Sequence, residues 1–411
     1  MLRLPTESIL GRKEKIMAEW IERKISDIGT VVGGATPSTK KPENYDDGKI
    51  AWITPKDLST FSSRYIERGE RNITEIGLKS CSTQLLPPNT VLFSSRAPIG
   101  YVAIAANEVC TNQGFKSVIP NENTDPLFLF YLLKYNKGKI EGMGSGTTFK
   151  EVSGNTMKNI LVNVPTDKKV QEKIASILGS IDDKIEENER INNNLLEQAL
   201  TLYATQFSLL KLNGCIGDYC SVKSGFAFKS SWWTNCGIRV IKIGSINQDN
   251  LNLLECSYVD EDKADRAKDF VVKAGDLLIA MTGATIGKYA MVPYSSEVLL
   301  VNQRVGKFFL GNNPVEKLPF IYCTLKQPEV YGEVVNRGQG SAQPNISASD
   351  IMSIPCVIPS QDAINDFNDM SQPLFDLIIS NQRENQQLSE LRNALLPKLM
   401  SGELDVSGID L

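Results

Sequence analysis

The side chains best suited to chemistry in this sequence are hydrogen-bonding groups on two glycine-rich loops. Residues 144–147 read Gly-Ser-Gly-Thr, and residues 338–341 read Gly-Gln-Gly-Ser. Such loops offer backbone N–H groups and hydroxyls to phosphate oxygens, while nearby Arg, Lys, Asn and Gln side chains can pair with base edges. The two loops are therefore candidates for contact with a nucleic acid, and whether the chain is a binding protein or an enzyme depends on the catalytic residue types that it contains.

Candidate DNA-contacting residues lie on predicted loops or strand ends around these two segments. In the first half of the chain they are Lys56, Ser94, Ser95, Arg96, Thr147, Thr148 and Lys150. In the second half they are Lys242, Ser245, Thr282, Lys288, Gln343 and Asn345. The competing interpretation is that these are solvated loop residues and that the glycines serve only the backbone conformation.

The residue types needed for common catalytic sites are missing. The sequence has no histidine, which excludes Ser-His-Asp and Cys-His systems and His-ligated metals. Residues 283–289 approach a P-loop but are one residue short, with Tyr289 where Ser or Thr should bind magnesium. No Gly-x-Gly-x-x-Gly motif opens a βαβ unit. We expect a binding protein, not an enzyme, with no metal and no cofactor in this chain.

The elements that must position the candidate residues occur twice, about 190 residues apart. The matching landmarks are Ile25 and Ile216, Asp27 and Asp218, Gly34 and Gly225, Asn112 and Asn302, Gln113 and Gln303, Ser153 and Ser347, and Pro165 and Pro359. Between the glycine-rich loop and the proline, each landmark of the second copy lies 194 residues after its counterpart in the first. This predicts a duplicated domain rather than a short solenoid repeat. The recurring Asn-Gln pair could read adenine, but because it is common to both copies we expect it to have a structural task.

Each copy ends in a long segment with apolar residues spaced four and three apart, as in a coiled-coil seam. The predicted helix-pairing residues are Ile174, Ile181, Asn188, Asn192 and Leu195 in the first segment, and Leu374, Ile378, Asn381, Asn385 and Leu388 in the second. Asparagine in a seam costs stability but fixes register and partner. Its matched placement favours pairing of the two helices with each other, and the alternative is two surface helices that each pack on their own domain.

The predicted fold is α+β, with two mixed β-rich domains joined by two long antiparallel coiled-coil helices in an internal pseudo-two-fold repeat. We expect an N-terminal extension at 1–19, domains at 20–165 and 211–359, a helix at 166–210, and a second helix with a tail at 360–411.

Charge is unevenly distributed over a chain whose net charge is −4. Residues 20–164 carry 17 Lys and Arg against 14 Asp and Glu, and residues 216–358 carry 14 of each. The helical segments are acidic, so the domains could contact DNA but need help from a basic partner. Eight scattered cysteines form no Cys-x-x-Cys pair, and no long apolar run or secretory signal is visible, which predicts a cytoplasmic protein without a membrane partner.

The order of several segments resembles the specificity subunit of type I restriction–modification systems over residues 20–405. The segments that carry the resemblance are 20–27, 144–147, 160–165, 171–178 and 395–402.

This resemblance implies that each mixed domain is a target recognition domain for one half of a split double-stranded DNA sequence. It implies that the helices are spacers docking two methyltransferase subunits, with restriction subunits as further partners. S-adenosylmethionine, ATP and Mg²⁺ would belong to those partners.

Two other functions compete with this interpretation. A DNA methyltransferase would need an (Asn/Asp/Ser)-Pro-Pro-(Tyr/Phe) loop, whereas the single Pro-Pro here is followed by Asn89. The alternative is a non-catalytic scaffold that binds protein or glycan partners. Purified complexes that lack a methyltransferase would indicate this scaffold.

Overall fold

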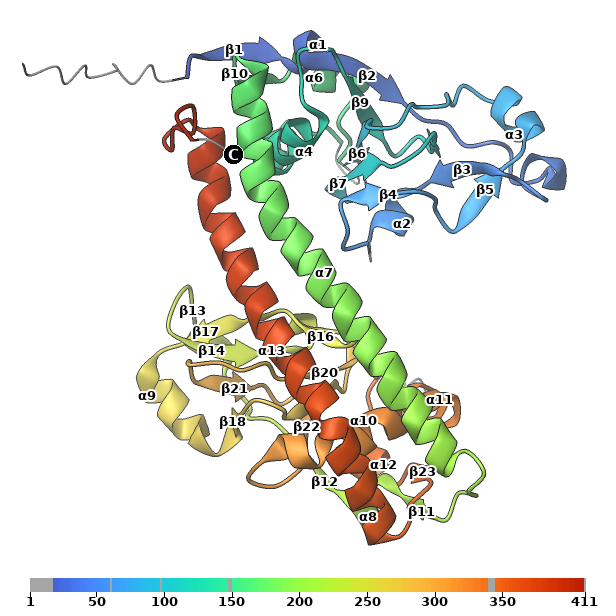
Figure 1. The fold of residues 1–411 in the computed structure, drawn as a ribbon, viewed down its shortest axis with the longest axis vertical. Coiled ribbons are helices and arrows are strands. Elements are labelled where there is room, and N and C mark those ends of the chain that lie inside the picture. The colour runs from blue at the N-terminus through green and yellow to red at the C-terminus, as the bar shows by residue number, and fades with distance from the viewer. Residues whose placement is uncertain (1–17, 60, 97, 147–149, 339–343, 410–411) are drawn as a thin grey trace, which may run out of the picture. The chain divides into compact units, whose positions relative to one another are not determined.

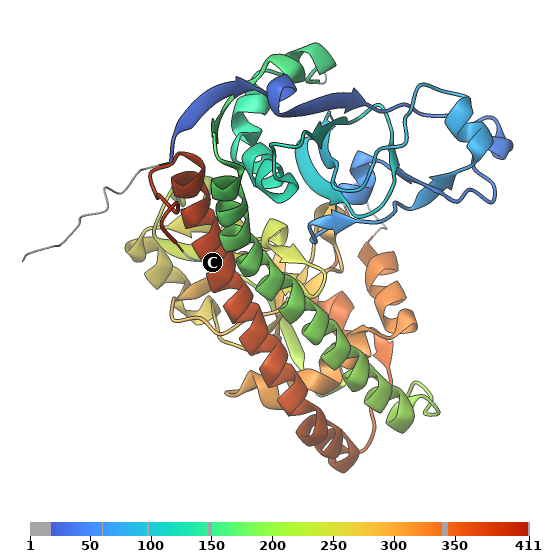
Figure 2. The ribbon, with the colours of Figure 1, turned by 45° about the horizontal axis from the view of Figure 1, so that its top comes forward.

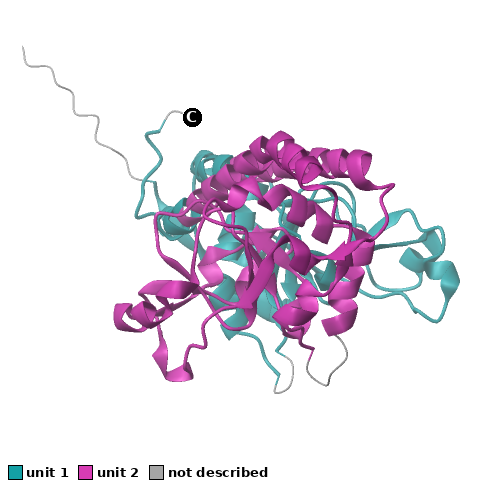
Figure 3. Cartoon of the chain, turned by 90° about the horizontal axis from the view of Figure 1, so that it is seen from below, with its two compact units in different colours: residues 1–183, 391–411 teal, residues 184–390 magenta. Residues whose placement is uncertain are grey.

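Two compact units make up the chain. The structure, a computed structural model, describes residues 18–409 except 60, 97, 147–149 and 339–343. Unit 1 comprises residues up to Asp183 together with the segment from Leu391, and unit 2 comprises Lys184–Glu390 (Figure 3). Each unit therefore holds one sequence repeat and part of each of two long helices.

Unit 1 contains a five-stranded sheet in the order β2-β9-β6-β7-β4, a three-stranded sheet in the order β5-β3-β8, and the pair β1-β10 (Figure 1). Its strands are β1 (Trp20–Lys24), β2 (Gly29–Gly33), β3 (Ile50–Ile53), β4 (Tyr65–Ile66), β5 (Arg71–Ile73), β6 (Val91–Ser95), β7 (Ile99–Ala105), β8 (Cys110–Thr111), β9 (Lys116–Pro120) and β10 (Leu161–Pro165). Its shorter helices are α1 (Ile25–Ile28), α2 (Pro55–Leu58), α3 (Glu75–Lys79), α4 (Pro126–Tyr135), α5 (Lys137–Gly142) and α6 (Gly154–Asn159).

Unit 2 contains a four-stranded sheet in the order β12-β22-β19-β20, a five-stranded sheet in the order β13-β17-β14-β21-β18, and the pairs β11-β23 and β15-β16. Its strands are β11 (Gly214–Cys215), β12 (Ser221–Ser224), β13 (Trp233–Thr234), β14 (Ile238–Ile241), β15 (Ile246–Asn247), β16 (Asn250–Leu251), β17 (Ser257–Val259), β18 (Val271–Val272), β19 (Leu277–Ala280), β20 (Tyr289–Met291), β21 (Leu299–Val301), β22 (Val305–Phe309) and β23 (Pro355–Cys356). Its shorter helices are α8 (Ile216–Tyr219), α9 (Glu261–Ala264), α10 (Leu318–Leu325), α11 (Pro328–Gly338) and α12 (Ala348–Met352).

The two units share a common topology. The order β2-β9-β6-β7 in unit 1 corresponds to β12-β22-β19-β20 in unit 2, and β5-β3-β8 corresponds to β17-β14-β21. The pairing directions agree as well, because β3 and β14 each have one antiparallel and one parallel neighbour. The duplication and the α+β fold class predicted from the sequence are thus confirmed.

Repeated side chains act as helix caps in both units. The carboxylates of Asp27 and Asp218 accept hydrogen bonds from main-chain N–H groups three residues earlier, at 3.0 and 2.8 Å. The hydroxyls of Ser153 and Ser347 cap α6 and α12 by accepting from main-chain N–H groups three residues later. Such caps satisfy N–H groups that a helix leaves unpaired, which gives a physical reason for their recurrence.

The long helices α7 (Lys168–Phe207) and α13 (Gln361–Met400) lie side by side within each unit (Figure 2). In unit 1 the early residues Ile174 and Leu178 of α7 share a core with Leu399 near the end of α13. In unit 2 the late residue Tyr203 of α7 packs edge-on against Phe367 near the start of α13, with ring centroids 5.6 Å apart. The helices are therefore antiparallel. None of the helices in the described part of the chain has the length and apolarity that a membrane span requires.

Candidate nucleic-acid interface

Three main-chain hydrogen bonds organise the strand ends beside the first glycine-rich loop. The Asn112 N–H donates to the Ile53 carbonyl at 3.0 Å and the Ala35 N–H donates to the Thr111 carbonyl at 3.0 Å. The Ser95 N–H donates to the Gly114 carbonyl at 2.7 Å. We call this set the strand-end frame.

Unit 2 repeats the strand-end frame at the matching positions. The Asn302 N–H donates to the Ile241 carbonyl at 3.0 Å and the Phe226 N–H donates to the Val301 carbonyl at 2.8 Å. The Met281 N–H donates to the Arg304 carbonyl at 3.0 Å. The backbone of the candidate interface is therefore built in the same way twice, whatever side chains it carries.

The recurring asparagines stabilise this frame. The Asn112 side-chain oxygen accepts from the Gly114 N–H at 2.8 Å, and the Asn302 side-chain oxygen accepts from the Arg304 N–H at 3.3 Å. An Asn that bonds to the backbone two residues later forms a local turn. The asparagine of each recurring Asn-Gln pair therefore has the structural task that the sequence predicted: it forms a local turn in the frame.

In each unit, the residue before the N–H donor of the second frame hydrogen bond is a glycine, because two backbone segments approach closely there. A Cβ atom at Gly34 or Gly225 would lie under 3.0 Å from carbonyl oxygens of Thr111 or Val301. Backbone atoms cannot move aside cheaply, so these two positions require glycine.

The chain leaving each glycine-rich loop lies along the end of β6 or β19. In unit 1 Glu151 forms a β-bridge with Arg96, and the Val152 N–H donates to the Ser95 carbonyl at 3.0 Å. In unit 2 Asn345 forms a β-bridge with Thr282, and the Ile346 N–H donates to the Met281 carbonyl at 2.9 Å. Three of the predicted contacts, Thr147, Thr148 and Gln343, lie outside the described residues.

One surface surrounds the strand-end frame of each unit. The first edge comprises Lys56, Arg96, Gln113, Lys116, Lys150 and Glu151. The second edge comprises Lys242, Thr282, Lys288, Gln303, Arg304 and Asn345. Pro55, the residue before Lys56, lies close to Gly114, and Ile243, the residue after Lys242, lies near Gly283. The first edge holds three of the seven contacts predicted in unit 1, and the second edge holds four of the six predicted in unit 2.

The cations of the first edge are paired with carboxylates. The Arg96 guanidinium lies 3.6 Å and the Lys116 ammonium 3.5 Å from the Glu151 carboxylate. Lys56 forms an exposed ion pair with Glu70 at 2.7 Å, which raises the pKa of its ammonium group. Ion pairs this exposed contribute little to stability. Lys56 can therefore exchange its carboxylate partner for phosphate.

The second edge carries cations of a different kind. The Lys242 ammonium lies 3.4 Å from the ring centroid of Trp233, and burial lowers the pKa of this ammonium. Lys288 is half-buried, whereas Gln303 and Arg304 are exposed. The second edge thus exposes the amides of Gln303 and Asn345 and the Arg304 guanidinium, whereas the predicted contact Thr282 has its hydroxyl buried.

Three of the predicted DNA contacts are buried instead of exposed. Ser94 and Ser95 are fully buried, and their hydroxyls donate to the carbonyls of Pro98 at 2.8 Å and Gly114 at 3.1 Å. Ser245 is also fully buried, with its hydroxyl 3.7 Å from the Cys256 sulfur. In this structure these hydroxyls hold the interior together and present nothing to a base edge.

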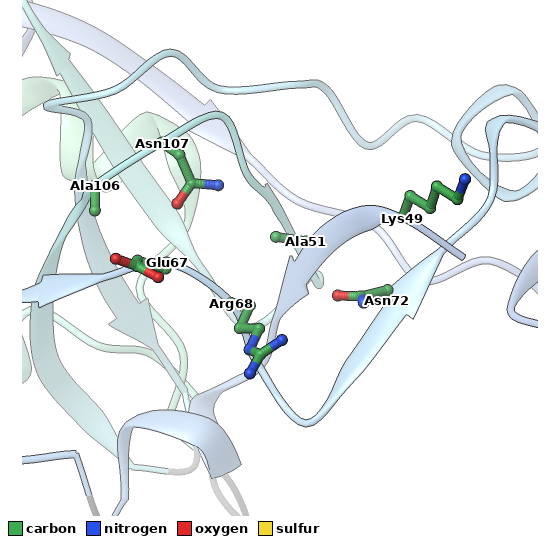
Figure 4. Close-up of a pocket in the computed structure, with 7 residues that line it drawn as sticks. All are labelled: Lys49, Ala51, Glu67, Arg68, Asn72, Ala106 and Asn107. Atoms are coloured by element: carbon green, nitrogen blue, oxygen red, sulfur yellow. The ribbon is translucent and has the colours of Figure 1, made fainter. Parts of the chain in front are cut away.

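A polar hollow of about 400 Å³ lies beside β3 and β5 in unit 1 (Figure 4). Its lining includes Lys49, Arg68, Asn72 and Asn107. Cofactor pockets are mostly apolar, whereas amide and guanidinium groups suit base edges and phosphates. Sequence reasoning missed these residues because they lie outside the loops on which it concentrated.

The predicted seam asparagines meet in two pairs within unit 2. The Asn188 amide donates to the Asn385 side-chain oxygen at 2.8 Å, and the Asn381 amide donates to that of Asn192 at 2.8 Å. The Asn188 amide also donates to the Glu384 carboxylate at 2.7 Å, which lowers the pKa of that carboxyl group.

The other predicted seam residues also lie in the two cores. Ile378 is buried and Leu195 and Leu374 are partly buried in the core of unit 2. Leu388 is partly exposed. Ile174 and Ile181 are buried in unit 1.

A buried network that the sequence did not indicate lies beside the seam in unit 1. The Tyr131 hydroxyl donates to the Asp182 carboxylate at 2.6 Å, and the Arg392 guanidinium donates to the same carboxylate at 2.5 Å. Desolvation raises the pKa of the tyrosine hydroxyl. This network ties α4 to both long helices. Seam spacing could not predict it because the aspartate lies next to a seam position and not in it.

Comparisons with known proteins agree with this architecture. The family described as "Type I restriction modification DNA specificity domain" matches residues 17–197 and again 213–390. The MjaIX specificity subunit of a type I restriction enzyme from Methanocaldococcus jannaschii is 34% identical, with 95% of each chain covered. The HindI specificity subunit from Haemophilus influenzae is 22% identical over 94% of this chain and 100% of its own.

Among solved structures, the S subunit of a type I restriction–modification system from Mycoplasma genitalium superposes with a TM-score of 0.54 at 17% identity. The match covers 94% of this chain and 98% of that chain, and it supports the fold. Two matches to one family model, one in each half, also agree with the repeated strand order. The chain therefore belongs to the family of type I restriction–modification DNA specificity subunits.

Proposed function

We propose that this specificity subunit reads a bipartite DNA sequence, with the first edge and the second edge each contacting one half-site. The observation that carries the proposal is the strand-end frame, which recurs bond for bond in both units while its side chains differ. Base pairs are distinguished by donor and acceptor patterns in the major groove. Edges with one backbone and different side chains suit two half-sites of different sequence.

Charge supports a division of labour between this chain and its partners. The acidic long helices and the nearly neutral domains give limited phosphate-binding strength. Methyltransferase subunits docked on α7 and α13 would supply the remaining cations, together with S-adenosylmethionine. Restriction subunits would bring ATP and Mg²⁺, so that this chain selects the site and performs no chemistry itself.

Exposed apolar residues on α13 support docking of a protein subunit there. Met370 and Leu377 are 50% and 46% exposed and stand seven residues apart, on one face of the helix. Contiguous exposed apolar patches mark contact surfaces between proteins, and these two side chains would form part of such a patch. Neither residue belongs to the seam between the helices.

Genome-wide mapping of methylated bases, with and without this gene, tests the proposal. We expect deletion to abolish methylation at one split motif. Exchange of residues 25–160 for those of a relative should then change only one half of that motif. Unchanged methylation in the deletion strain, with its methyltransferase still active, would refute the proposed function, and a change in both halves would refute the assignment of one unit to each half-site.

A further inference from the structure

One position of the strand-end frame differs sharply between the two units. In unit 1 it holds Gly114, which is buried and whose added Cβ would lie 2.8 Å from Pro55 and 2.9 Å from the Asn112 side chain. In unit 2 the equivalent position holds Arg304, which is exposed. Only the second frame has room for a side chain here.

The backbone of Arg304 is fixed at both ends while its side chain is exposed. Its N–H donates to the Asn302 side chain and its carbonyl accepts from the Met281 N–H. Within the described part of the chain, no hydrogen bond or ion pair involves its guanidinium group. The fixed backbone leaves only the side chain to be ordered on binding, which lowers the entropy cost relative to a mobile loop.

The chemistry and placement of Arg304 favour a base edge over a phosphate. Arginine pairs through two N–H groups with O6 and N7 of guanine, the commonest specific contact in the major groove. A phosphate contact positions the protein and carries no sequence information, so both units would need it. Arg304 has no counterpart in unit 1, and Gln303 beside it is a second exposed group able to read bases.

We propose that Arg304 is a specificity-determining residue of the second half-site and that its guanidinium pairs with a guanine there. This inference rests on the proposed function and names the residue through which the second edge would read sequence.

The test uses the full chain assembled with its methyltransferase subunits and duplexes that carry every single base-pair change in the mapped target. Arg304→Ala should lower discrimination at one G·C pair of one half-site by roughly 5- to 150-fold, the range for a lost bidentate contact. Arg304→Lys should lower the discrimination less than Arg304→Ala, because lysine can donate to guanine but lacks the planar fork, and should keep the salt dependence of binding, because it keeps the charge.

Arg266→Ala is the matched control, because it removes the same charge from the same unit on a segment rich in acidic residues. Arg266→Ala should leave the discrimination between base pairs unchanged. Unchanged discrimination at the other base pairs of the same half-site shows that unit 2 of the Arg304 variants is folded. An Arg304→Ala variant that weakens all duplexes equally, or none, overturns the inference while the proposed function stands. A wild-type complex that prefers no split sequence overturns the proposed function itself.

Discussion

The polar layer between α7 and α13 is the part of the fold where a single substitution should have the clearest energetic effect. Asn188 is 1% exposed and donates to both Asn385 and Glu384. Replacing Asn188 with Leu removes both bonds and leaves the Asn385 side-chain oxygen without this donor. We therefore expect Asn188→Leu to destabilise unit 2, although leucine suits a helical seam.

The expected size follows from the cost of an unsatisfied buried polar group, about 1–3 kcal/mol. A unit of roughly 200 residues loses about 2–4 °C in Tm for each kcal/mol. Asn188→Leu should therefore lower the Tm of unit 2 by about 2–12 °C. Asn193→Leu, an exposed position on the same helix, should change stability by no more than about 0.5 kcal/mol.

The double variant Asn188→Leu/Asn385→Leu separates loss of a partner from loss of polarity. Replacing both partners by apolar groups can be nearly neutral, so the double variant should be more stable than the single one by about 1 kcal/mol or more. Calorimetry of the purified full chain measures both changes. The reasoning fails if Asn188→Leu changes stability no more than the Asn193→Leu control does. It also fails if the double variant loses as much stability as the two single variants together.

Three further changes test other parts of the structure. Gly225→Ala should destabilise unit 2 by about 1–3 kcal/mol or more, because the added Cβ would clash with backbone carbonyls. Gly244→Ala is the control and should not destabilise the unit, because its added Cβ meets nothing within 4 Å. Thermal unfolding of the two variants compares their stabilities. Tyr131→Phe should cost about 1–3 kcal/mol because a buried carboxylate loses its hydroxyl donor, and the same change at the exposed Tyr135 should be neutral in urea titrations. Asp218 has a pKa held below its ordinary value by a main-chain N–H, so it stabilises unit 2 above about pH 4 and loses that effect as the pH falls. Asp218→Asn should therefore flatten the Tm profile between about pH 4 and pH 2.

Sequence reasoning succeeded where a local rule determines the three-dimensional result. A constant offset between landmarks predicted a duplicated domain, and the strand orders agree with it because equivalent apolar runs form equivalent strands. Heptad spacing predicted that Asn188 and Asn385 belong to a helical seam, and in the structure they meet there. Both inferences depend on periodicity alone, which tertiary packing rarely overrides.

Sequence reasoning was weakest where burial depends on distant segments. Ser94 and Ser95 follow an apolar run and resembled an exposed strand end, yet β6 is buried on both faces from Val91 onward. A strand covered on both sides loses the alternation that would reveal which residues face solvent. Asp182 similarly looks like a solvated helix residue until Tyr131 and Arg392 are seen to enclose it.

The strand-end frame explains how one architecture could serve two different recognition surfaces. Its hydrogen bonds run between main-chain groups, and the side chains that its geometry requires are a glycine at each close approach and an asparagine at each turn. Main-chain bonds place no demand on neighbouring side chains, so the residue after the recurring Asn-Gln pair can be Gly114 in one unit and Arg304 in the other. A comparison of the two repeats could have found this position, because it is where one residue type changes inside an otherwise repeated motif. In a duplicated binding protein, such positions on a shared backbone are the ones at which a difference in specificity can arise without altering the fold.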